Sequence, residues 1–117
     1  MKRLFAVIAL VLLTACSAFA LSDAEYLRLK KSNADFARAD KRLTQIWKKV
    51  KAALDEEVFE ELKENQLEWI NYVRDEKAES LMQEGYSRAE AYTIATNDRA
   101  DYLQGVLNSV TRRRGRK

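Results

Sequence analysis

The chain of 117 residues is long enough for one domain, and its formal net charge of +3 arises from 21 Lys and Arg against 18 Asp and Glu. It contains no histidine and one cysteine, Cys16, which excludes a zinc site of Cys and His, a Cys–His nucleophile pair and an intramolecular disulfide. The stability of the domain must therefore come from packing alone, without the disulfides on which many small domains rely.

Residues 1–20 have the features of an export signal. The chain begins with the basic sequence MKR, and the apolar run at residues 4–13 is too short to span a bilayer as a mature helix. Ala18-Phe19-Ala20 is an A-x-A site, which favours cleavage before Leu21. Under this alternative residues 1–20 are a signal peptide and the mature protein is secreted.

A second processing site overlaps the first. Leu13-Thr14-Ala15-Cys16 resembles a bacterial lipobox, which would remove residues 1–15 and make Cys16 the lipid-modified first residue. The two alternatives remain open, but both export the chain. We therefore expect a periplasmic or extracellular domain at residues 21–111, and a lipid on Cys16 is the only membrane contact that the sequence indicates.

Helical signals then follow in chain order. Ser22-Asp-Ala-Glu25 matches a capping box and predicts a short helix that ends near Ser32-Asn33. A second helix is predicted over residues 34–54, where apolar side chains recur at steps of three and four residues. They are Phe36, Ala39, Leu43, Ile46, Val50 and Leu54, with Trp47 beside them.

A long third helix is predicted from Asp55, a candidate N-cap, to about Glu84, with Gly85 as the residue that ends it. Ser87-Arg-Ala-Glu90 is another capping box and opens a last helix that extends to about Val110. The short connections between these helices imply antiparallel neighbours. The predicted fold is all-α: an up-down-up bundle of three main helices with a short N-terminal helix.

Charge is distributed unevenly over this bundle. Residues 21–52 carry nine Lys and Arg against four Asp and Glu, whereas residues 53–111 carry five against fourteen. The acidic stretch at residues 55–64 is a solvated face or a surface that meets a cationic partner. The last six residues, 112–117, read RRRGRK, and we expect them to form a basic disordered tail.

Several polar residues lie on faces that the periodicity predicts to be buried. Gln66 and Lys77 project from the middle of the apolar face of the third helix. Asp40 borders the apolar face of the second helix, and Arg99 lies near the centre of the apolar face of the last helix. Folding the chain at its two predicted turns places Asp40 level with Ile70 and Arg99 level with Tyr72, with Gln66 about one turn away. We interpret them as a buried polar network, with Arg99 paired to Asp40, that fixes helix register. The alternative is the floor of a binding cleft.

The aromatic residues Trp47, Trp69, Tyr92 and Tyr102 are predicted to be core residues from their spacing. Tyr72 projects away from the apolar stripe of its helix, and Asp75 points away from it as well, with Arg74 at the border. Asp75 is therefore expected to be the most accessible of the three. No Ser–His pair, phosphate loop or metal cluster is present, so the sequence does not indicate an enzyme or a cofactor.

Three segments together resemble the lysozyme-inhibitor LprI-like N-terminal domain family of small exported bacterial helical proteins. They are Ala39-Asp40-x-x-Leu43-Thr44-x-x-Trp47, Gln66-x-x-Trp69-x-x-Tyr72-x-Arg74-Asp75 and Arg99-x-x-x-Leu103, within residues 31–107. The chain departs from the family pattern in having Thr44 for a usual Asn, Trp47 for a frequent Tyr, Val73 before the Arg-Asp pair, and Ala78 where members often have a cysteine.

The resemblance implies an envelope protein that acts by non-catalytic protein–protein binding, with lysozyme as the candidate partner and Tyr72, Arg74 and Asp75 as candidate contacts. The acidic stretch at residues 55–64 would attract a basic lysozyme. An alternative is a structural or adaptor lipoprotein, tethered through Cys16, that uses its basic tail on anionic surfaces. Because the chain is exported, nucleic acid is not an expected partner.

Overall fold

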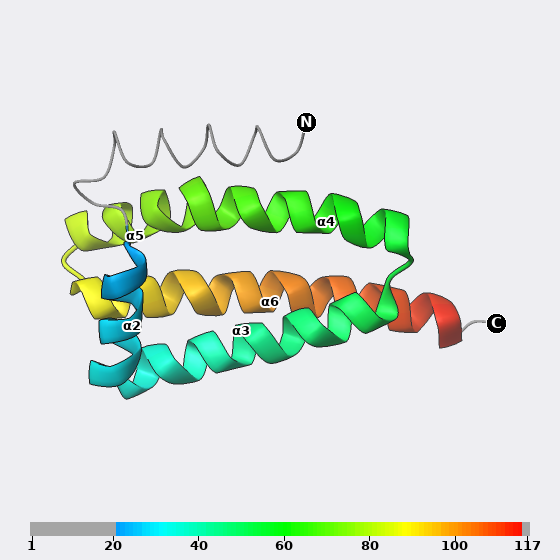
Figure 1. Ribbon diagram of the computed structural model, residues 1–117, viewed down its shortest axis with the longest axis horizontal. Helices are drawn as coiled ribbons and strands as arrows, with labels where there is room; N and C mark the ends of the chain where they lie inside the picture. The colour runs from blue at the N-terminus through cyan, green and yellow to red at the C-terminus, as the bar shows by residue number, and fades with distance from the viewer. Residues whose placement is uncertain (1–20, 116–117) are drawn as a thin grey trace.

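The computed structural model describes residues 21–115, and all regular secondary structure in this range is helical (Figure 1). The elements are α2 (Asp23–Ser32), α3 (Ala34–Ala53), α4 (Glu56–Glu68), the π-helical turn η1 (Trp69–Val73), α5 (Arg74–Gln83) and α6 (Arg88–Gly115). The segments α4, η1 and α5 form one continuous rod. This rod runs antiparallel to both α3 and α6, while α2 crosses one end of the bundle. The predicted all-α, up-down-up bundle is confirmed.

Two helix starts are capped by the sequence motifs that predicted them. The hydroxyl of Ser22 accepts a hydrogen bond from the backbone N–H of Glu25 at 3.2 Å. The Ser87 hydroxyl accepts one from the Glu90 N–H at 3.1 Å, and the Glu90 carboxylate accepts the Ser87 N–H at 2.9 Å. Asn33 caps α3 in the same way. Each cap satisfies N–H groups that a helix leaves without an internal partner, so the boundaries follow from local chemistry.

The end of α5 is also determined locally. Gly85 has a φ of 108°, a conformation that glycine adopts without the steric cost of a Cβ. Its N–H donates to the carbonyl of Met82 at 3.1 Å, and the N–H of Tyr86 donates to that of Leu81 at 3.1 Å, as in a Schellman motif. At the start of α4, by contrast, Asp55 occupies the N-cap position but its side chain makes no capping hydrogen bond.

The π-helical turn changes which side of the rod faces the core. The N–H of Arg74 donates to the carbonyl of Trp69, five residues back, so the turn contains one residue more than an α-helix would. Each additional residue offsets the following side chains by about 100°. As a result Ala78 is fully buried, whereas Val73, which was predicted on the apolar face, is exposed. Ile70, at the start of the turn, was also predicted on that face and is exposed where it lines a pocket.

The core consists of two apolar clusters at different levels of the bundle. One contains Leu21, Phe36, Ala78, Ala91 and Tyr92, and the other Ile46, Val50, Leu62, Ala100 and Leu103. Along α6, the buried polar residues Thr96 and Arg99 lie between Tyr92 and Leu103. A polar layer therefore separates the two apolar clusters.

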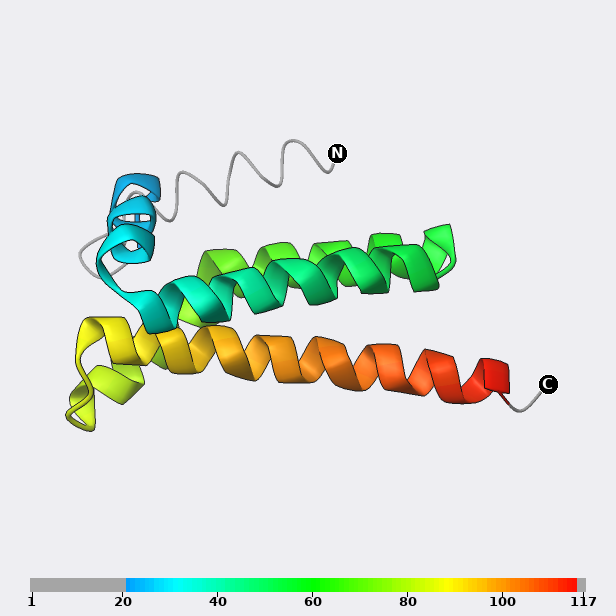
Figure 2. The same ribbon diagram turned by 90° about the horizontal axis from the view of Figure 1, so that it is seen from below.

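The last helix is longer than predicted. It continues to Gly115, so residues 112–115 are helical rather than disordered, and this end of α6 projects beyond α3 and the rod (Figure 2). Cys16, the remainder of the predicted export signal and residues 116–117 lie outside the described residues. Within residues 21–115, none of the helices combines the length and apolarity needed to cross a membrane.

Candidate functional site

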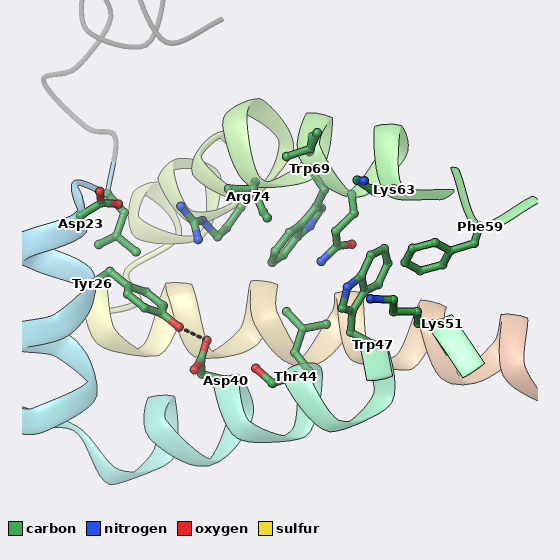
Figure 3. A pocket seen from close by; sticks show the side chains of 15 residues that line it. Asp23, Tyr26, Asp40, Thr44, Trp47, Lys51, Phe59, Lys63, Trp69 and Arg74 are labelled. Carbon is green, nitrogen blue, oxygen red and sulfur yellow. Dashed lines mark hydrogen bonds between the residues drawn. The ribbon is translucent and has the colours of Figure 1, made fainter. Parts of the chain in front are cut away.

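An open groove of about 580 Å³ lies between α3 and the rod and is closed at one end by α2. Four aromatic residues from four different elements line it, namely Tyr26, Trp47, Phe59 and Trp69 (Figure 3). The rings of Trp47 and Phe59 contact each other across the groove, with centroids 5.1 Å apart. We call this feature the α3–α4 groove. Its size and mostly apolar lining are typical of sites that receive a ligand or the side chains of a partner.

Arg74 places a guanidinium group in this groove, between Tyr26 and Trp69 (Figure 3). Its side chain is only 13% exposed, and its Nε atom is buried without a hydrogen-bond partner. The nearest carboxylate oxygen is that of Asp75, 3.9 Å from Nε. An unpaired buried donor is costly in a folded protein. Because Arg74 lines the groove, its guanidinium places a positive charge beside any group that enters.

Asp40 lies on the opposite wall and is neutralised by α2. Its carboxylate accepts a hydrogen bond from the Tyr26 hydroxyl at 2.5 Å and forms an ion pair with Lys30 at 3.3 Å. Burial, together with the hydrogen bond and the charge of Asp40, raises the pKa of Tyr26, so the hydroxyl stays protonated and donates. The predicted pairing of Asp40 with Arg99 is therefore wrong. It was estimated from the three main helices, whereas α2 folds back and supplies the partners.

Arg99 reaches the rod instead. Its Nε donates to the side-chain oxygen of Gln66 at 2.6 Å and its Nη2 to that of Asn65 at 2.7 Å. The guanidinium also lies 5.7 Å from the ring centroid of Trp69 and 4.6 Å from that of Tyr102. Desolvation lowers the pKa of Arg99, and Tyr102 partly opposes this effect. The structure thus brings Gln66 and Arg99 together, and it adds Asn65, which the sequence analysis missed although it directly precedes Gln66.

The π-helical turn reverses two of the predicted orientations. Lys77, expected to point inward, is exposed and forms an ion pair with Asp98 of α6. Asp75, expected to be the most accessible candidate contact, has a side chain only 15% exposed. Its carboxylate accepts hydrogen bonds from the Tyr92 hydroxyl at 2.7 Å and from the Leu21 N–H at 3.3 Å. Both expectations assumed an uninterrupted α-helix and are corrected here.

The predicted burial of the aromatic residues is confirmed for some of them and wrong for others. Trp69 and Tyr92 are buried as expected, and Trp47 is half-buried in the wall of the groove. Tyr102, predicted in the core, is 49% exposed. Tyr72 is exposed on η1 and does not line the groove, so it remains a candidate contact on the neighbouring surface.

The rod also presents a strongly acidic surface. Helix α4 contains six glutamates and one lysine, and five of the glutamates are exposed. Lys63 is paired with Glu60 at 3.8 Å and lines the groove, so most of the excess negative charge faces solvent. In the part of the chain that the structure describes, no group of three or more Asp, Glu, Cys or His is placed to hold a metal ion.

The family model described as "Lysozyme inhibitor LprI" matches residues 16–111, which is most of the chain. No curated protein and no solved structure matches.

Proposed function

Because the chain belongs to the lysozyme inhibitor LprI family, we propose that it is an exported binding protein that inhibits lysozyme by non-catalytic protein–protein contact. The family match over residues 16–111 carries this proposal. The described residues add an open aromatic groove lined by the Arg74 guanidinium. Such a site suits binding, and it requires no cofactor.

The proposed contact surface is the α3–α4 groove together with the exposed face of η1. Trp47, Phe59 and Trp69 offer apolar area to a side chain of the partner, and aromatic residues in recessed positions commonly dominate binding energy. Arg74 lines the groove, so its guanidinium would meet a carboxylate or carbonyl oxygen of the partner. Tyr72 lies two residues before Arg74 on the exposed surface and would contact the rim.

The acidic surface of α4 has a separate role in this proposal. Exposed charges act mainly on the rate of encounter, whereas buried anchors act on the rate of dissociation. A basic lysozyme would therefore be attracted by the α4 glutamates and held by the groove. Neutralising Glu57 and Glu61 should slow association at low salt and leave dissociation almost unchanged, while Arg74→Gln should speed dissociation.

The test is lysozyme turnover on purified cell walls with the mature protein in stoichiometric excess. Wild-type protein should suppress turnover, and Arg74→Gln should weaken binding by about tenfold, the equivalent of about 1.4 kcal/mol. Arg42→Gln is the matched control, because Arg42 forms a half-exposed ion pair with Asp101 away from the groove. If wild-type protein leaves turnover unchanged, the proposed function is wrong.

A second function is favoured by the end of α6. Arg112 and Arg113 are exposed on the part of the helix that projects beyond the bundle, where they could contact an anionic envelope surface. Deleting residues 112–117 separates the two proposals. An inhibitor should keep its affinity for lysozyme, whereas an adaptor should be released from envelope fractions.

A further inference from the structure

The carboxylate of Asp75 lies in an enclosed site at the junction of α2, α5 and α6. Its Oδ1 atom accepts the Tyr92 hydroxyl at 2.7 Å and the backbone N–H of Leu21 at 3.3 Å. The Arg74 Nε is farther away, at 3.9 Å, and does not form a hydrogen bond with it. Asp75 thus has two neutral donors at hydrogen-bonding distance, which compensate a buried negative charge less well than a cation would.

The position of the Leu21 nitrogen is fixed by packing. The Leu21 side chain is only 9% exposed and belongs to the apolar cluster that contains Phe36, Ala78 and Tyr92. The next residue, Ser22, is the N-cap of α2. Because the side chain is anchored in the core and the following residue begins a helix, the nitrogen atom of residue 21 is held beside Asp75.

This nitrogen belongs to the peptide bond that the A-x-A site marks for cleavage. Hydrolysis adds water across the Ala20–Leu21 bond: the carbonyl carbon of Ala20 gains the hydroxyl and becomes a carboxylic acid, and the Leu21 nitrogen gains a hydrogen. The acid then loses a proton, and the amine takes one up at neutral pH. The product is an α-ammonium group with three donors and a positive charge, in place of an amide with one donor.

We propose that Asp75 is the binding site for the α-ammonium group of Leu21 that cleavage after Ala20 creates. A cationic donor then replaces the neutral amide at the same position, which adds the attraction of an ion pair to the hydrogen bond. Processing would therefore complete the packing of α2 against α5 and α6. It would also give Asp75 a cation at hydrogen-bonding distance, closer than the Arg74 guanidinium, whose Nε lies 3.9 Å away.

The test compares the chain beginning at Leu21 with the same chain retaining Ala20, which moves the ammonium group by about one residue, or 3.8 Å. Retaining Ala20 should lower the Tm by about 5 °C at pH 6.5. The same comparison in an Asp75→Asn background should show no difference, because the acceptor charge is gone. Should the Asp75→Asn variant not fold, acetylation of Leu21 in the wild-type chain provides the second arm and should lower the Tm similarly.

The pH dependence of this Tm difference distinguishes an ion pair from a steric effect of the added residue. An α-amino group has an ordinary pKa of about 7.7 to 8.0, and pairing with a carboxylate raises it in the folded state. The difference should be complete below that range and disappear as the pH rises through the raised value. The charged or titratable groups around the site are Asp75 and Arg74 of α5, Tyr92 and Arg88 of α6, and Tyr26 and Glu25 of α2.

Equal Tm values at pH 6.5 for the two wild-type chains would overturn the proposal. So would mass spectrometry of the protein exported from the full-length precursor, if its first residue is a lipid-modified Cys16 rather than Leu21. Neither measurement involves lysozyme, so the proposal stands or falls separately from the inhibitory function.

Discussion

Replacing Arg99 with Met tests whether the polar layer stabilises the bundle. Arg99 is 9% exposed, and methionine is an unbranched residue that can follow a similar path through the core. The substitution removes the hydrogen bonds to Gln66 and Asn65 and the contact with the Tyr102 ring. It also leaves the buried oxygen of Gln66 without its donor.

The expected magnitude follows from these contacts. Two hydrogen bonds from a charged donor contribute about 1.5 kcal/mol each at the lower end of their range. The cation–π contact with the half-exposed Tyr102 adds about 0.5 to 1 kcal/mol. Against this, the substitution removes the desolvation cost of the buried guanidinium, the same cost that lowers the pKa of Arg99, so the loss is smaller than the sum of these contacts. The net expectation is a loss of about 2 to 3 kcal/mol.

Urea unfolding followed by tryptophan fluorescence measures this loss, since Trp69 lies beside the guanidinium. In a thermal scan the same loss corresponds to a Tm lower by about 10 to 20 °C for a domain of this size. Arg42→Met is the control, because its ion pair with Asp101 is largely solvated and should be worth less than about 1 kcal/mol.

The double variant Arg99→Met, Gln66→Leu provides the decisive comparison. Removing both partners of a buried hydrogen bond is nearly neutral, so the second substitution should recover about 1 kcal/mol or more. The structural interpretation would be refuted if Arg99→Met unfolds at the wild-type urea concentration and loses only partner binding. In that case Arg99 would belong to the binding surface.

Three further perturbations test other parts of the fold. Phe36→Ala should cost about 3 to 4 kcal/mol in urea unfolding, because the ring is 1% exposed and truncation leaves a cavity. Hydrogen bonds from Ser87 lower the pKa of Glu90. The stabilisation that they give to the start of α6 is therefore present above about pH 4.3 and lost as the pH falls through the lowered pKa. Circular dichroism should show a loss of helix over this pH range in the wild type but not in Glu90→Gln. Deleting Tyr72 should abolish cooperative unfolding by turning Lys77 toward the core, whereas Tyr72→Ala should change stability by less than about 0.5 kcal/mol.

The sequence determined the features that depend on neighbouring residues. The hydroxyls of Ser22 and Ser87 and the amide of Asn33 cap helices in the structure, and Gly85 ends the rod in the conformation that glycine favours. These interactions span three or four residues, so they can be identified without knowing the fold. The apolar periodicity then predicted the all-α bundle, because each helix needs to bury one face.

The tertiary structure decided the orientation of the residues after η1. A helical wheel advances about 100° per residue, and no local feature of Trp69–Val73 indicated that the helix would add a residue there. One inserted residue was enough to turn Asp75 toward Tyr92 and Lys77 toward solvent. The sequence therefore identified the candidate residues and predicted the accessibility of Tyr72, Gln66 and Arg99, but not that of Asp75 and Lys77.

The tertiary structure also decided which side chains form hydrogen bonds and ion pairs with each other. Asp40 was recognised as a polar residue beside an apolar face, but its partners Tyr26 and Lys30 come from a short helix whose direction depends on how Leu21 packs. The α3–α4 groove and the buried Nε of Arg74 arise only once α2, α3 and the rod are in place. The chemistry of each side chain determines whether it needs a hydrogen-bond or ion-pair partner, and this can be read from the sequence. Which side chains come into contact depends on the packing of segments that are distant in the chain.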